Sequence, residues 1–141
     1  MSDFTDVILL FSYLEDSVLQ HIISQPCPPR RRTALQRIQV GQRGRAARAL
    51  GRHPRGAECH VLAGTFNHLN TGKLRSTLQQ LPWKCPHSVQ LLLHNENDAL
   101  FGMWILLDGH WLEVPIPRTT RRPADGHLHR TDCPDDEYQQ P

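Results

Sequence analysis

The side chains around His68 are the strongest candidates for catalysis in this chain of 141 residues. Asn67, His68 and Asn70 follow an apolar stretch typical of a strand and precede a stretch typical of a helix. Catalytic groups of α/β proteins often lie at such strand ends, and His94, at the end of the neighbouring parallel strand, could complete a small site. The alternative is that both asparagines cap the helix and His68 covers its first turn. Because no nucleophile paired with a base and no GxSxG, P-loop, GxGxxG or HExxH motif is present, the sequence favours a protein without chemistry of its own.

The cysteines and histidines lack the spacing of a metal site. Zinc is usually held by four nitrogen or sulfur ligands from two tight pairs at a fixed spacing. The chain has no CxxC pair, so we expect no metal and no cofactor, with surface histidines and buried cysteines instead. The groups considered are Cys59 with His60, Cys85 with His87, and His127 and His129 with Cys133.

A cluster of arginines is the most prominent charge pattern, and no acidic residue occurs between Asp16 and Glu58. Guanidinium groups pair with phosphates, so this segment could bind nucleic acid through its charge. Its spacing fits no known DNA-reading motif, and no aromatic residue between Tyr13 and Phe66 offers a surface for base stacking. A solvated basic loop is the alternative. The arginines are Arg30, Arg31, Arg32, Arg37, Arg43, Arg45, Arg48, Arg52 and Arg55.

Trp83 is the best candidate for contact with another protein. It follows Pro82 and precedes Pro86 in a stretch that predicts a loop. An exposed aromatic side chain in such a loop could anchor a partner, as interface hot spots often do. The sequence therefore assigns a partner-binding role to Trp83, Pro82 and Pro86.

Composition divides the chain into folded and unfolded parts. The hydrophobic fraction of 38% and the mean hydropathy of -0.50 are low for a compact domain, and the apolar residues concentrate in residues 7–23, 61–81 and 89–114. We therefore expect one domain over residues 1–117, interrupted by a disordered basic insertion at 27–57, and a disordered tail over 118–141. The longest apolar run, residues 7–14, is too short to span a bilayer. With no basic segment opening the chain, we expect a cytoplasmic protein without disulfides.

Apolar periodicity predicts the elements that position these side chains. We expect the first helix to end before Pro26 and the second before Pro82. The pair Asp108-Gly109 indicates a hairpin turn. The unit from Glu58 to His94 should have parallel strands with a right-handed crossover. The fold class is α+β, a mixed sheet of about five strands with two helices on one face, ferredoxin-like. Strands are predicted near 6–14, 58–66, 88–94, 100–107 and 110–114, and helices near 16–25 and 71–81.

The segment from Ala63 to Trp104 resembles small uncharacterised proteins of actinobacteria and their phages. The shared features are Phe-Asn-His-Leu at 66–69, Pro-Trp at 82–83 and Val-Gln-Leu-Leu at 89–92. The resemblance covers roughly half of the chain and implies a fold without an activity. In such proteins the stretch before Phe-Asn-His-Leu is mixed in charge. Here residues 28–56 have the composition of GC-rich DNA read in a wrong frame, so a frameshifted or newly acquired segment is a hypothesis.

These observations favour a small non-catalytic binding domain whose partner is another protein. The first alternative is a nucleic-acid-binding protein that uses the arginine-rich segment. The second is a small enzyme centred on His68.

Overall fold

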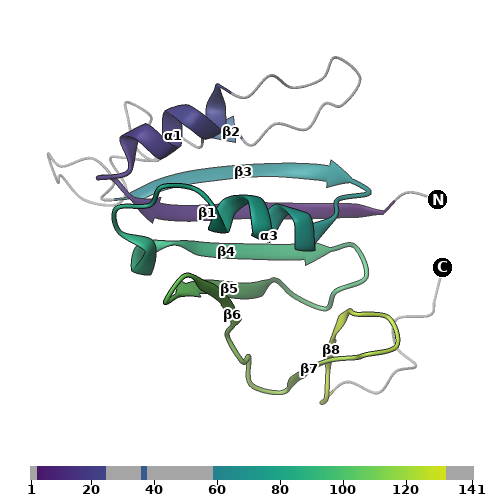
Figure 1. The fold of residues 1–141 in the computed structure, drawn as a ribbon. Helices are drawn as coiled ribbons and strands as arrows, with labels where there is room; N and C mark the ends of the chain where they lie inside the picture. The colour runs from purple at the N-terminus through teal and green to yellow at the C-terminus, as the bar shows by residue number, and fades with distance from the viewer. Residues whose placement is uncertain (1–2, 25–35, 38–58, 133–141) are drawn as a thin grey trace, which may run out of the picture.

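The computed structural model describes residues 3–24, 36–37 and 59–132. Its main feature is an antiparallel sheet with the strand order β2-β3-β1-β4-β5-β6. A separate pair, β7 and β8, forms a hairpin (Figure 1). The strands are β1 (Phe4–Ser12), β2 (Gln36–Arg37), β3 (Cys59–Asn67), β4 (Gln90–Asn95), β5 (Gly102–Leu107), β6 (His110–Glu113), β7 (Thr119–Arg121) and β8 (Leu128–Arg130).

Strand β1 is the centre of the sheet and pairs in antiparallel fashion with both β3 and β4. The unit from β3 to β4 therefore has parallel strands, as expected, but β1 lies between them. His94 is consequently not on the strand next to His68. Every neighbouring pair is antiparallel, so the expectation of a mixed sheet is wrong. Strand β1 lies between β3 and β4, which are distant from it in the sequence. The apolar periodicity within one strand does not predict which strands become its neighbours.

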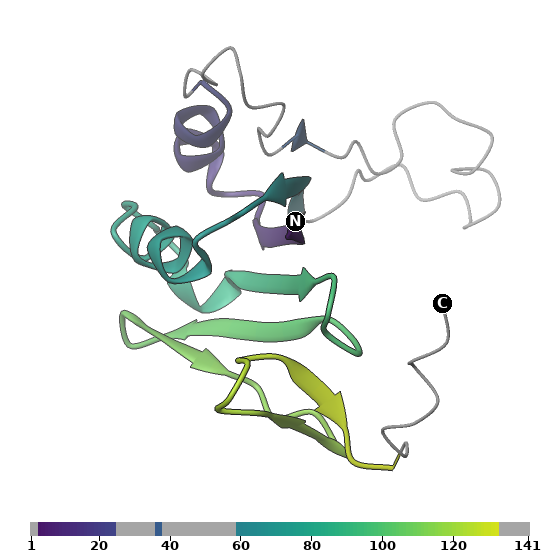
Figure 2. The ribbon, with the colours of Figure 1, turned by 90° about the vertical axis from the view of Figure 1, so that its right-hand side faces the viewer.

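Two helices cover one face of the sheet, α1 (Asp16–Ile23) and α3 (Thr71–Gln79), and Figure 2 shows them on the same side. A single turn of 3-10 helix, η1 (Pro86–Ser88), precedes β4. Asn70 caps the start of α3, because its side-chain oxygen accepts a hydrogen bond from the Lys73 N–H at 2.9 Å. These observations confirm the α+β class and the two helices, while the ferredoxin-like topology stays a prediction.

The core lies between the sheet and the helices because alternate residues of each strand point to the same face. Val7, Leu9 and Phe11 of β1 are all at most 1% exposed. They pack with Leu19 of α1 and Leu78 of α3 in one cluster. The helices thus cover the odd-numbered face of β1, and the even-numbered residues point away from them.

Two predictions about unfolded segments need correction. Gln36 and Arg37, inside the expected insertion, form β2 and pair with Ala63 and Leu62 of β3, because the free edge of β3 offers unpaired backbone groups. The rest of the segment 27–57 lies outside the described residues. The expected tail is wrong for residues 119–130, where β7 and β8 pair and Leu128 is only 5% exposed. Residues 133–141 lie outside the description.

Candidate functional site: a cavity under helix α3

A cavity of about 280 Å³ opens on the helix-covered side of the sheet, at the end where α3 begins. Its floor comes from β1, β4 and β5, one wall from α3, and the other wall from the turn between β7 and β8. Polar and aromatic side chains mix in its lining. The lining residues are Thr5, Leu69, Thr71, Arg75, Leu93, Asn95, Asp98, Trp104, Arg121, Asp125, Gly126 and His127.

Arg75 of α3 and Trp104 of β5 form the most distinctive contact in this cavity. The guanidinium carbon of Arg75 lies 4.1 Å from the centre of the Trp104 ring, a distance typical of a cation–π interaction. Trp111 holds the helix in place by donating its indole N–H to the Arg75 carbonyl oxygen at 2.7 Å. Both tryptophans belong to the β5–β6 hairpin, so contacts with this hairpin fix the position of Arg75.

The charge of Arg75 lacks a direct counter-ion among the described residues. No carboxylate there forms an ion pair with it, and burial is the main cause that lowers its pKa, followed by the nearby charge of Arg121. Glu113 acts on Arg75 only at longer range and in the opposite direction. The Arg75 guanidinium lines the cavity and can pair with an acidic group that enters it.

Arg121 differs from Arg75 because its charge is neutralised. Its Nε lies 3.0 and 3.1 Å from the two carboxylate oxygens of Glu113, and its Nη2 also donates to that carboxylate. This hydrogen-bonded pair is the main cause that raises the Arg121 pKa. A Cβ at Gly102 would lie 3.1 Å from Arg121 Nη2 and 3.2 Å from Leu128, so a residue without a side chain allows this close packing.

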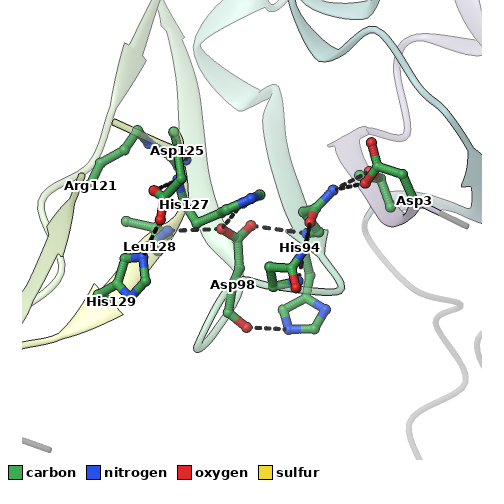
Figure 3. Close-up of polar contacts among 12 residues, drawn as sticks. Asp3, His94, Asp98, Arg121, Asp125, His127, Leu128 and His129 are labelled. Atoms are coloured by element: carbon green, nitrogen blue, oxygen red, sulfur yellow. Dashed lines mark hydrogen bonds and ion pairs between the residues drawn. The ribbon is translucent and has the colours of Figure 1, made fainter. Parts of the chain in front are cut away.

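Asp98 fastens the β7–β8 hairpin to the rest of the domain (Figure 3). Its carboxylate accepts hydrogen bonds from the backbone N–H groups of Asn95 at 2.9 Å and Leu128 at 2.8 Å. His127 Nδ1 lies 3.6 Å from the same carboxylate, whose side chain is 6% exposed. The carboxylate of Asp125 likewise accepts from the His127 N–H and lies 3.0 Å from His129 Nε2. Both acidic groups of the cavity are thus hydrogen-bonded within the fold.

The remaining polar groups of the cavity are also held in place. Asn95 donates from its side-chain amide to Asp3 at 2.5 Å, and the same nitrogen is 3.4 Å from the Thr5 hydroxyl. The indole nitrogen of Trp104 is buried and has no hydrogen-bond partner in the part of the chain described. Among the described residues, the Arg75 guanidinium has no carboxylate partner and lies over the aromatic surface of Trp104. This arrangement suits the binding of a small acidic group.

The structure places the predicted partner-binding residues in a different region. Trp83 is half-buried, donates its indole N–H to the Leu78 carbonyl at 2.7 Å and packs edge-on against Phe11 at 5.2 Å. Pro82 and Pro86 are exposed beside it. The Trp83 ring therefore has a structural role, and partner binding by these three residues stays a prediction.

The predicted catalytic group at His68 is exposed and has a positive φ of 54°. Its backbone N–H donates to the Asp3 carbonyl at 2.8 Å, and Asn70 is a helix cap. His94 stacks on Phe101 at 4.9 Å and lies 3.8 Å from Asp6. Among the described residues these contacts do not unite His68 with a base or a nucleophile.

The predicted nucleic-acid-binding arginines fall almost entirely outside the described residues. Arg37 belongs to β2, and the other eight lie outside the described residues. No group of three or more histidine, cysteine or acidic side chains within the described ranges could hold a metal ion. None of the described helices has the length and apolarity needed to cross a membrane.

Sequence reasoning missed Arg75, Arg121 and the cavity itself. Arg75 follows Leu74 on α3, so its side chain begins beside the apolar stripe of that helix. That position was the only local signal. Comparison with known proteins adds nothing to the assignment: no family model matches this chain, and neither a curated protein nor a solved structure shows a significant match.

Proposed function

We propose that this chain is a non-catalytic binding domain and that its cavity holds an acidic group of a protein partner. The observation that carries the proposal is the guanidinium of Arg75, which stacks on Trp104 and has no carboxylate partner among the described residues. A glutamate or aspartate side chain, or a chain-terminal carboxylate, would supply the missing counter-charge. Hydrogen bonds between a guanidinium and a carboxylate are among the strongest in proteins.

The contacts of the neighbouring groups support a carboxylate as the bound group. Arg121 lines the same cavity, and its own pairing with Glu113 leaves Arg75 as the group to be neutralised. The hydroxyl group of Thr71 lines the same cavity and can hydrogen-bond to neutral atoms of a peptide. A cavity of about 280 Å³ is small, which suits one side chain or chain end rather than a larger metabolite.

The two alternatives have less support from the described residues. A nucleic-acid-binding role would depend on the arginine-rich segment. Apart from β2, this segment lies outside the described residues. An enzyme centred on His68 would need a reacting partner beside that side chain, and no contact of His68 with the described residues supplies one. A cytoplasmic location belongs to the main proposal, and the free thiols of Cys59 and Cys85 suit a reducing compartment.

Titration with short acidic peptides tests the proposal. The probe is an N-acetylated peptide with three glutamates, and its matched control has three glutamines. Resonances of the Arg75 Nε–H and the Trp104 indole N–H are followed by NMR. We expect the glutamate peptide to shift both resonances at millimolar concentration and the glutamine peptide to leave them unchanged.

Two variants on the same helix give the matched comparison. Arg75→Gln should weaken binding about tenfold or more, because a hydrogen bond to a charged group contributes roughly 1.5–3 kcal/mol. Lys73→Gln removes the same charge from an exposed position two residues earlier, on the opposite side of the helix, so it should change affinity less than about twofold. Equal binding of both peptides, no shift with either, or unchanged affinity in Arg75→Gln would each refute the proposal.

A further inference from the structure

The sheet face opposite the helices has an apolar surface that we name the open face. Its residues form two rows across the strands, as the register shows. One row joins Ala63, Ile8, Leu92 and Met103, and the other joins Val61, Leu10, Gln90, Ile105 and Leu112. These side chains are partly exposed, and Leu112 is 50% exposed.

This pattern is unusual for an antiparallel sheet with one face in water. Such strands normally alternate apolar residues toward the core with polar residues toward solvent. Here β1 and β5 are apolar on both faces, in residues 7–11 and 103–107. Strands of this kind are typical of sheets that are covered on both sides, but both described helices lie on one side (Figure 2).

The open face also has very little charge. Within β1, β3, β4, β5 and β6, Asp6 is the only acidic residue that points to it, and no lysine or arginine does. The Thr65 hydroxyl donates to the Asp6 carboxylate at 2.6 Å, and His94 lies 3.8 Å from it. The two apolar rows contain no charged side chain, so they can pack against an identical surface without bringing like charges together.

The size of the face fits an interface between two copies. Five strands about 4.8 Å apart, with about six residues each, give a footprint of roughly 24 by 20 Å. The accessible area of a layer of side chains exceeds its footprint. The footprint is about 480 Å², against about 800 Å² that each partner buries in an interface of standard size, so the face fits an interface at the small end of the range. Interfaces of homodimers are also more apolar than those of transient complexes, as this face is.

We propose that two copies of this chain form a symmetric dimer by packing their open faces together. The two sheets would stack face to face with the side chains of both rows interdigitated, as in a sandwich of two sheets. The proposal is independent of the acidic-group site, because that cavity opens on the helix-covered side. A dimer of this geometry would present its two cavities on opposite outer surfaces.

Sedimentation equilibrium of the full chain over a wide concentration range tests the dimer. We expect a mass of twice 16.2 kDa at high concentration, with reversible dissociation on dilution. Leu92→Lys places a charge in the middle of the open face and should raise the dissociation constant more than tenfold. Leu92→Thr, which keeps a side chain suited to a strand, should raise it by a smaller factor.

Ser76→Lys on the exposed surface of α3 adds the same charge on the other side of the sheet and should leave the dimer unchanged. Circular dichroism of each variant separates loss of the dimer from loss of the fold. A wild-type chain that is monomeric at every concentration overturns the proposal, whether or not the face binds another protein or a lipid surface. A dimer that persists in folded Leu92→Lys and Leu92→Thr overturns it as well.

Discussion

Glu15 shows how one buried side chain can join segments that are far apart in the sequence. It is the residue before α1 and is 0% exposed. Its carboxylate accepts a hydrogen bond from the backbone N–H of Cys85, 70 residues away. Its second oxygen is buried without a hydrogen-bond partner among the described residues. The side chain therefore links the end of β1 to the loop that precedes β4 instead of capping its own helix.

We expect Glu15→Ala to lower the free energy of unfolding by about 1–3 kcal/mol, because it leaves the Cys85 N–H without an acceptor. Glu15→Gln retains an acceptor oxygen of the same reach and removes a buried charge, so its loss should be smaller. Urea denaturation of the three proteins measures the difference. If Glu15→Gln destabilises the protein as much as Glu15→Ala, the hydrogen bond to Cys85 is not the reason that Glu15 is needed.

The residues of the candidate site illustrate which roles a sequence can reveal. Asn70 was expected as a helix cap, and the structure confirms that role, since a cap acts on a backbone group only three residues away. The pairing of Arg75 with Trp104 could not be predicted, because the two residues meet only after α3 packs on β5. Trp83 was predicted to contact a partner, and that stays a prediction, whereas its hydrogen bond to the Leu78 carbonyl is a contact that the sequence did not predict.

The β7–β8 hairpin is the element that sequence reasoning assigned least well. The low apolar content of this segment is typical of a disordered tail. Leu128 is its one buried apolar residue. Its attachment depends on polar contacts instead, including Asp98 with Leu128, Ala99 with Leu128, and Arg121 with Glu113. Hydrogen bonds between charged and backbone groups depend on geometry that hydropathy does not encode.

We expect the hairpin to loosen in acid. The pKa of Asp125 is lowered chiefly by the hydrogen bond from the His127 N–H, and that of Asp132 chiefly by the hydrogen bond from Arg130. A carboxyl whose pKa is lower in the folded state stabilises that state above its unfolded pKa of about 4. This contribution is lost as the pH falls through the lowered pKa. Because both carboxylates are exposed, the effect should be modest.

The pH dependence can be followed through the amide resonance of His127 between roughly pH 6 and pH 2. The groups that face Asp125 are His127 and His129, and those that face Asp132 are Arg118 and Arg130. Asp125→Asn retains an acceptor for the His127 N–H but cannot titrate, so the part of the transition due to Asp125 should disappear. A transition of unchanged size in this variant would show that another group controls the hairpin.

At the scale of the whole molecule, the folded unit extends beyond the boundary expected at residue 117. Residues 118–132 form one wall of the cavity and bury Leu128 against β5 near Gly102. A backbone hydrogen bond from the Ala99 N–H to the Leu128 carbonyl at 2.8 Å joins the main sheet to the β7–β8 hairpin. The hairpin should therefore contribute to global stability.

Truncation after residue 117 should lower the free energy of unfolding by roughly 2–4 kcal/mol, from the loss of one buried leucine and several hydrogen bonds. Truncation after residue 132 keeps the hairpin and should leave stability within about 0.5 kcal/mol of the full chain. Urea midpoints of the three proteins measure both effects. Equal stability of the chains that end at 117 and 132 would mean that the hairpin does not dock in solution.

The sequence by itself determined the α+β class, the positions of both helices and most strands, and the turn at Asp108-Gly109. These features follow from periodicity and turn chemistry over a few residues, which are local properties. Only the tertiary structure decided that β1 enters between β3 and β4, that the hairpin docks, and that Arg75 meets Trp104. Each of these depends on contacts between residues distant in the chain, such as Glu15 with Cys85 and Asp98 with Leu128. Such contacts exist only once the chain has packed.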